Sequence, residues 1–129
     1  MTGILLDTHF LYWWMTADAK LGASAKLIAA ASISVSIASQ WEMVLKHGAG
    51  KLPLPDVPIA AAIEREGFEL IPIRADHVDA SRSLPPGLSD PFDRLLLATA
   101  IVEDLTLLTR DKAIIAFASK LDANVVRQG

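Results

Sequence analysis

The chain alternates short apolar runs with longer stretches in which apolar residues recur at helical spacing. The short runs predict buried strands and the longer stretches predict helices. Expected strands cover residues 3–6, 33–36, 68–73, 105–109 and 124–126. Expected helices cover residues 8–16, 21–31, 36–47, 59–66, 75–83 and 91–103, with a short last helix after Asp111. Strands that alternate with helices favour an α/β fold, in which helices cover a mainly parallel sheet.

Local signals mark where two of these helices begin. Thr8 follows the first strand and is expected to cap the first helix. Asp90 is a favourable N-cap, and Pro91 suits the first helical position. The helix over 91–103 is apolar on nearly every side, so we expect it to be covered all round.

Two further helices carry apolar faces. In the helix over 36–47 the face consists of Ile37, Trp41, Val44 and Leu45, and we expect Trp41 in the core. Phe10, Trp13 and Trp14 follow helical spacing, but apolar residues also fill the other sides of that helix. One side should pack on the sheet, and the other either packs in the core or forms a partner surface.

Composition narrows the class of protein. The 129 residues are 52% apolar, which suits one domain over residues 1–129 with a sizeable core. The absence of cysteine excludes disulfides, thiolate metal sites and a cysteine nucleophile. No signal peptide or membrane span is expected, so we expect a cytoplasmic protein. The net charge of -3 argues against a simple basic nucleic-acid-binding domain.

Four acidic residues from distant segments are expected at one edge of the sheet. Asp7 directly follows the first strand, and Asp111 follows the strand over 105–109 by two residues. Glu42 lies on the helix after the second strand, and Asp93 is the third residue of the Pro91 helix. Ligands of parallel α/β sheets bind beyond the carboxyl ends of the strands, where all four would lie.

Each acid also has a purely structural explanation. Asp7 suits a turn, Glu42 a solvated helix face, and Asp93 the favourable dipole at a helix start. Asp90 and Asp111 are explained as N-caps. If the four acids do converge, their repulsion requires a divalent cation, and oxygen ligands without cysteine favour Mg²⁺ or Mn²⁺. Such ions activate water and stabilise a phosphodiester under attack.

Blocks of residues along the chain closely resemble PIN-domain ribonucleases, and most closely the VapC-type toxins of bacterial toxin–antitoxin pairs. The blocks are Leu5-Leu6-Asp7-Thr8-His9, Ser39-Gln40-Trp41-Glu42-Met43 with Lys46, Gly50-Lys51-Leu52, Asp90-Pro91-Phe92-Asp93-Arg94 with the apolar run after it, and Leu107-Leu108-Thr109-Arg110-Asp111. They occur in order over nearly the whole chain. Many relatives carry a histidine shortly before Asp90, and here residues 85–89 contain none.

The resemblance implies a three-layer α/β/α PIN fold and Mg²⁺- or Mn²⁺-dependent endonuclease cleavage of RNA. It implies that Asp7, Glu42, Asp93 and Asp111 are the catalytic and metal-binding residues, and that Thr109 supports them through its hydroxyl. We also place Thr8 and Asp90 among the supporting residues. The resemblance further implies a homodimer and a cognate antitoxin that inserts near the site.

Basic residues near this edge are candidates for holding RNA phosphates, and a solvated surface is the plain alternative for each. They are Lys46, Lys51, Arg94, Arg110 and Lys112. For Arg94, an ion pair with another acidic residue is an equally good explanation as contact with RNA. Setting four clustered acids aside leaves 11 acids against 12 bases, a nearly neutral surface. We therefore expect weak RNA binding without a divalent metal and stronger binding with one.

Other functions and residues are less well supported. His9, His47 and His77 are scattered, and none is expected to bind metal or act as the base. A phosphoacceptor or phosphatase domain would need a second carboxylate two residues after Asp7, where His9 stands. The remaining alternative is a catalytically inactive PIN-like module that binds RNA or protein.

Overall fold

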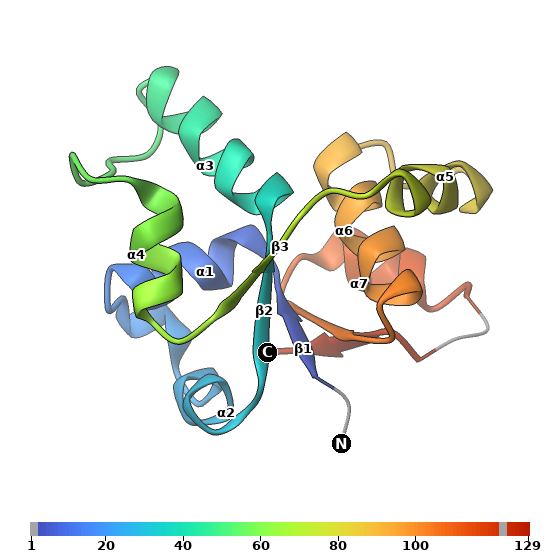
Figure 1. Ribbon diagram of the computed structural model, residues 1–129. Helices are drawn as coiled ribbons and strands as arrows, with labels where there is room; N and C mark the ends of the chain where they lie inside the picture. The colour runs from blue at the N-terminus through green and yellow to red at the C-terminus, as the bar shows by residue number, and fades with distance from the viewer. Residues whose placement is uncertain (1–2, 122–123) are drawn as a thin grey trace.

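The computed structural model describes residues 3–121 and 124–129, which form a parallel sheet between two layers of helices (Figure 1). The strands are β1 (Ile4–Leu6), β2 (Ile33–Ser36), β3 (Glu69–Ile71), β4 (Thr106–Thr109) and β5 (Val126–Gln128). Their order is β3-β2-β1-β4-β5, and every neighbouring pair is parallel. The expected three-layer α/β/α architecture is thereby confirmed. Residues 1, 2, 122 and 123 of the expected domain lie outside the described residues.

The helices divide between the two faces of the sheet, as Figure 1 shows with the sheet near the centre. One layer contains α1 (Thr8–Met15), α2 (Ser24–Ala30), α3 (Ile37–Gly48) and α4 (Ile59–Arg65), with the short 3-10 helix η1 (Ala19–Leu21). The other contains α5 (Ala75–Ser83), α6 (Pro91–Val102) and α7 (Lys112–Ala118). Among residues 3–121 and 124–129, no helix is both long and apolar enough to cross a membrane.

Alternating side chains of the central strand β1 supply both cores. Ile4 and Leu6 pack into a cluster with residues of the α1–α4 layer, whereas Leu5 packs with Leu107 against α6 and α7. This alternation follows from the pleat of a strand, which sends successive side chains to opposite faces. All of β1 is buried, so the residue after it, Asp7, emerges from the middle of the sheet.

Some expected element ends are displaced. The last strand begins at Val126 instead of residue 124, although Val125 already accepts a hydrogen bond from Leu107 N–H. The helix expected over 21–31 begins only at Ser24. Gly22, with φ of +54°, separates it from η1, and a helix cannot continue through that backbone conformation.

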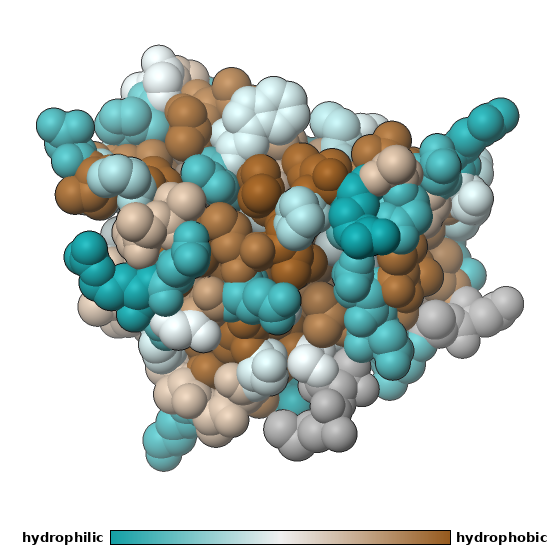
Figure 2. Space-filling view, viewed as in Figure 1, coloured by the Kyte–Doolittle hydropathy of each residue, from teal (hydrophilic) through white to brown (hydrophobic). Residues whose placement is uncertain are grey.

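The prediction for α3 is wrong in its orientation. Its most apolar face is exposed: Ile37 is 37% exposed, Trp41 55%, Val44 45% and Leu45 47%. Figure 2 shows apolar surface gathered in the upper part of the molecule, where α3 lies. The opposite, more polar face of the helix is buried against α1 and the sheet, as Ala38, Ser39, Glu42 and Met43. The helix therefore buries the side that carries its carboxylate, which positions Glu42 for the site.

Helix α6 is covered all round only in its middle. Residues 96–100 are all buried, but Ile101 and Val102 at its end are 39% and 37% exposed. At its start, Phe92 packs edge-on against Trp41, with ring centroids 5.5 Å apart. The apolar composition of this helix thus extends onto the surface at both ends.

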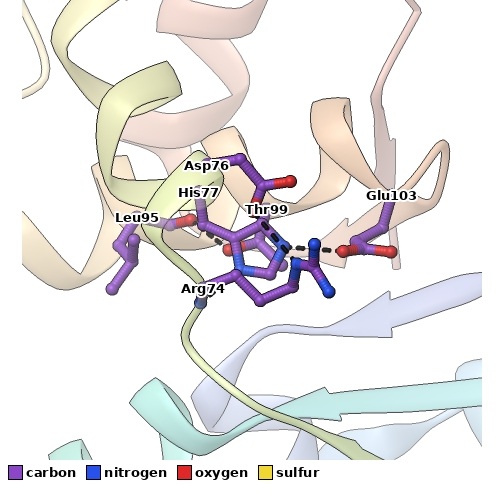
Figure 3. Close-up of polar contacts among 6 residues, drawn as sticks. All are labelled: Arg74, Asp76, His77, Leu95, Thr99 and Glu103. Carbon is purple, nitrogen blue, oxygen red and sulfur yellow. Dashed lines mark hydrogen bonds and ion pairs between the residues drawn. The ribbon is translucent and has the colours of Figure 1, made fainter.

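A buried histidine joins α5 to the end of α6 (Figure 3). His77 is fully buried, and its Nδ1 accepts a 3.1 Å hydrogen bond from the backbone N–H of Arg74 at the start of α5. The ring proton therefore lies on Nε2, which is 2.7 Å from Glu103 Oε1 and donates to it. His77 thus caps one helix and anchors the next, a structural role consistent with its exclusion from the proposed chemistry.

Candidate active site

Asp7 and Thr109 lie side by side at the carboxyl ends of two neighbouring strands. Leu6 of β1 is in register with Leu108 of β4, and the Asp7 N–H donates to the Leu108 carbonyl at 3.1 Å. The next side chains along both strands therefore meet. The Thr109 hydroxyl donates a 2.6 Å hydrogen bond to Asp7 Oδ2, and both residues are buried. This contact fixes the position of the Asp7 carboxylate.

Asp111 joins the same group through the backbone. Its N–H donates to Thr109 Oγ1 at 3.0 Å. Its own carboxylate oxygen Oδ1 accepts hydrogen bonds from the N–H groups of Ala113 and Ile114, so it also serves as the expected N-cap of α7. One threonine hydroxyl thus connects Asp7 and Asp111 across the loop that leaves β4.

Thr8 does not cap α1 as expected, and its hydroxyl makes a different contact. The N-cap position of α1 is Asp7, which makes no side-chain cap bond, and Thr8 is the first helical residue. The Thr8 hydroxyl donates to Ser39 Oγ at 3.0 Å, which ties α1 to α3. Ser39 was not among the sequence candidates, although its spacing three residues before Glu42 puts both on one helix face.

Glu42 faces the site from the buried side of α3. The residue is only 8% exposed, and its Oε2 lies 3.2 Å from the Nζ of Lys46 one turn later. Lys46 is thus the immediate counter-charge of Glu42.

Asp93 is held at the start of α6, where the expected cap is confirmed. Asp90 Oδ1 accepts the Asp93 N–H at 3.0 Å, and Pro91 occupies the first turn. Burial raises the pKa of the Asp93 carboxyl from 3.8 to about 7, helped by repulsion from Asp90, Asp7, Asp111 and Glu42. The three other predicted site acids therefore all act on Asp93 through their charge.

The pKa of Asp7 is also raised above its usual value. Burial is the main cause, and the charge of Glu42 adds to it. The hydrogen bond from Thr109, the charge of His9 and the Thr8 N–H oppose the shift. Two acids whose pKa values are raised together mark a site that favours a positive charge.

The carboxylates do not yet form a closed set of ligands. Among residues 3–121 and 124–129, no three histidine or carboxylate side chains lie close enough together to hold a metal ion. The structure therefore places the acids within reach of each other's charge, on four separate elements, but without a common coordination point. Mutual repulsion between carboxylates favours this spacing.

Arg94, one of the basic candidates, is engaged inside the protein. Its two terminal nitrogens donate to four backbone carbonyls, at distances of 2.9–3.0 Å. The accepting carbonyls belong to Ser81, Leu84, Pro85 and Leu88. The side chain thus fastens the loop between α5 and α6 to the helix that carries Asp93. It pairs with no acid among the described residues.

Arg110 is engaged in the same manner on the other side of the site. Its guanidinium donates to the carbonyls of Lys20, Leu21 and Gly129. Its Cζ also lies 5.0 Å from the ring centroid of Phe10 and 5.1 Å from that of Trp13. Lys51 and Lys112 are exposed, and Lys46 is partly exposed beside Glu42. The lysines are therefore better placed than the arginines to meet a polyanion.

A PIN-domain family model matches residues 4–120, most of the described fold and all four acids. The chain belongs to the PIN-domain family. It is 29% identical over 117 residues to a protein named Ribonuclease VapC22 from Mycobacterium tuberculosis (strain ATCC 25618 / H37Rv), covering 87% of this chain and 89% of the relative. The resemblance to VapC-type PIN-domain toxins indicated by the sequence blocks is thus confirmed.

Solved structures share the fold at lower identity. A toxin–antitoxin complex from Klebsiella pneumoniae matches with a TM-score of 0.62 and 21% identity over 97% of this chain and 96% of that one. VapBC2 from Rickettsia felis, bound to a DNA fragment from its promoter, matches with a TM-score of 0.68 and 17% identity over 98% of both chains. DNA-bound VapBC from Salmonella typhimurium matches with a TM-score of 0.69 and 13% identity over 99% and 98%.

Proposed function

We propose that this protein is a divalent-metal-dependent endoribonuclease and the toxin of a type II toxin–antitoxin pair. The observation that carries the proposal is the meeting of Asp7 and Asp111 at Thr109 beside Asp93, whose pKa is raised to about 7 mainly by burial and further by the charges of Asp90, Asp7, Asp111 and Glu42. Support also comes from a relative named as a ribonuclease and from structural neighbours described as toxin–antitoxin complexes.

Asp7, Glu42, Asp93 and Asp111 are the residues we propose to hold the ion. Their donor atoms are all carboxylate oxygens, which fit Mg²⁺ or Mn²⁺. Bound by these four acids, a divalent ion would supply positive charge toward a phosphodiester and would make a water molecule more acidic. Side-chain movements would be needed to close the set, because no three of the described histidine or carboxylate side chains lie close enough together to hold an ion.

The chain's own residues orient this chemistry. Thr109 holds the Asp7 carboxylate through its 2.6 Å hydrogen bond, and the Thr8–Ser39 contact holds α3 against α1. Lys46, 3.2 Å from Glu42, orients that carboxylate and brings positive charge to the entrance. RNA is the substrate class we propose, with Lys46, Lys51 and Lys112 as the candidates for its phosphates.

The test is cleavage of RNA by purified Asp7→Asn and Asp93→Asn variants with Mg²⁺ or Mn²⁺. We expect both to lose activity, whereas Asp79→Asn, at an exposed position of α5, should cleave like the wild type. Calorimetric titration with Mn²⁺ should show binding to the wild type and weaker binding to both site variants. Unchanged cleavage by both site variants would contradict the proposal.

An inactive PIN-like module is the second candidate, and the lack of three converging ligands among the described residues is the observation that favours it. The same titration separates the two functions. A wild-type protein that binds no Mn²⁺ at millimolar concentration and leaves RNA intact would support the inactive module.

We propose two protein partners as well. The exposed apolar residues Ile37, Trp41, Val44 and Leu45 of α3, with Phe92 of α6, form what we term the α3–α6 patch. Neighbouring exposed apolar residues mark interaction sites, and we propose that a second copy of the chain covers this patch in a symmetric dimer. The other partner is a cognate antitoxin, which we expect to be encoded in the neighbouring reading frame.

A further inference from the structure

Two cavities flank the exposed side chain of His9, and one of them reaches Asp7 and Asp111. The first has a volume of about 240 Å³ and is lined by Asp7, His9, Trp13, Arg110 and Asp111. The second has a volume of about 280 Å³ and is lined by Thr8, His9, Tyr12, Lys46, Lys51 and Leu52. His9 is thus the wall between a cavity that reaches the acids and a cavity that carries two lysines.

Trp13 forms a fixed wall of the first cavity. Phe10, fully buried, packs edge-on against it with ring centroids 5.3 Å apart. The Arg110 guanidinium lies 5.1 Å from its ring centroid and is itself anchored by the carbonyls of Lys20 and Gly129. These contacts hold the indole in place, so a ligand that packs against it should lose little affinity to ordering the site.

The chemistry of this cavity suits a nucleobase. The rings of His9 and Trp13 lie 5.9 Å apart at 38° and both line the cavity, so they present adjoining aromatic surfaces and leave no slot between them for a flat ligand. Unpaired bases stack on such side chains, whereas bases inside a duplex cannot reach them. A cavity of about 240 Å³ has room for a single base. Because Asp7 and Asp111 line it as well, the base it takes belongs to a nucleotide beside the reacting phosphate.

The second cavity suits the sugar–phosphate chain. Lys46 and Lys51 give it positive charge, and Tyr12 is held in place by its hydroxyl, which donates to the Pro53 carbonyl at 3.0 Å. Lysine ammonium groups bind phosphates as mobile point charges, independently of sequence. Base and backbone would thus be held on opposite sides of His9.

We propose that His9 and Trp13 form a base-stacking subsite for single-stranded RNA, with the adjoining backbone bound by Lys46 and Lys51. This inference rests on the proposed ribonuclease function, and it names the substrate form, an unpaired nucleotide next to the scissile phosphate. His9 acts through its ring face, as a positioning residue, and needs no proton transfer.

The test compares His9→Ala with His9→Phe, because Phe keeps an aromatic face and loses the imidazole nitrogens. Binding of fluorescent single-stranded RNA homopolymers is measured by anisotropy with Mn²⁺ in the Asp93→Asn background, which prevents cleavage. His9→Ala should weaken binding about 5-fold or more, and His9→Phe should bind like the parent. An abasic ribose–phosphate strand should bind all three proteins equally. Trp13→Leu and Trp13→Phe form a second pair with the same expectation.

The possible failures are distinct. Equal RNA binding by the parent, His9→Ala and Trp13→Leu would overturn the subsite, while cleavage by the wild type would leave the nuclease function standing. His9→Ala could instead leave RNA binding unchanged and weaken binding of the co-expressed antitoxin. That result would also overturn the subsite, because it assigns the cavity to a protein partner. A wild type that neither binds nor cleaves RNA would remove the proposed function and this inference with it.

Discussion

Thr109 donates its hydroxyl proton to Asp7 at 2.6 Å while accepting the backbone N–H of Asp111 at 3.0 Å. The hydroxyl carries a single proton. Because its oxygen accepts the Asp111 N–H, that proton is free to point only away from Asp111, toward Asp7. Two acids from neighbouring strands are therefore held in one arrangement by a single side chain. The same bond lowers the pKa of Asp7, against the effect of burial.

Replacing Thr109 by valine should impair the site with little change in shape. The Asp7 carboxyl would lose its hydrogen bond, so its pKa would rise further, and the Asp111 N–H would lose its acceptor. We expect cleavage at fixed Mn²⁺ to fall about 10- to 100-fold, as for other residues that orient metal ligands. More Mn²⁺ or higher pH should recover part of the activity. Thr109→Ser, which keeps the hydroxyl, is the control, and equal loss in both variants would contradict this role.

The raised pKa of Asp93 predicts how stability depends on pH in the absence of metal. The folded state holds this proton up to about pH 7, whereas the unfolded chain releases it near its usual pKa of 3.8. The folded state therefore binds more protons over that range, and the contribution of Asp93 to stability decreases as pH rises. The site is partly open to water, which screens the repulsion and makes the dependence shallower.

Thermal unfolding in EDTA is the measurement for Asp93. The wild type should gain in Tm when the pH is lowered from 7.5 to 5.5, and Asp93→Asn should flatten that dependence and raise Tm at pH 7.5. Mn²⁺ should stabilise the wild type more at pH 7.5 than at pH 5.5, because ionised carboxylates bind it better. A pH dependence that is identical in wild type and Asp93→Asn would show that Asp93 does not control it.

Part of this site follows directly from the order of the residues. Asp7 after β1 and Asp111 after β4 could be placed at one edge, because neighbouring parallel strands end together. The caps at Asp90 and Asp111 follow from local sequence alone. Both caps are short-range signals, and the structure confirms them.

What the sequence could not predict depends on partners far along the chain. The Arg110 guanidinium binds the carbonyl of Lys20, 90 residues away, and a backbone acceptor leaves no mark in the pattern of side chains. The sequence pattern predicts the wrong buried face for α3, because the most apolar face of this helix is the exposed one. The side with Ser39 and Glu42 is buried instead, where Ser39 accepts a hydrogen bond from Thr8 of α1. The hydrophobic pattern therefore mispredicts the buried face of this helix. Agreement between local sequence signals and the fold is most easily lost near functional sites.

Arg94 should matter for stability more than for RNA. Its four hydrogen bonds to backbone carbonyls need the fork of a guanidinium, which a lysine cannot reproduce. We expect Arg94→Lys to lower the free energy of unfolding by roughly 2 kcal/mol or more in urea. Arg82→Lys, at an exposed position on α5, should change it little. If Arg94→Lys were fully stable but bound RNA less well, the side chain would instead serve the substrate.

The exposed face of α3 predicts the state of association. Trp41 is 55% exposed and touches Phe92, so a charge there would sit in the middle of the α3–α6 patch. If a second copy covers the patch, Trp41→Glu must bury an unpaired carboxylate at the interface, a cost of several kcal/mol that would dissociate the dimer. Sedimentation velocity over a range of concentrations should show a wild-type dimer and a Trp41→Glu monomer. Val57→Glu, which changes a 50% exposed apolar residue outside the patch, should leave the dimer intact. A wild type that stays monomeric at every concentration, or a dimeric Trp41→Glu, would assign this face to another partner.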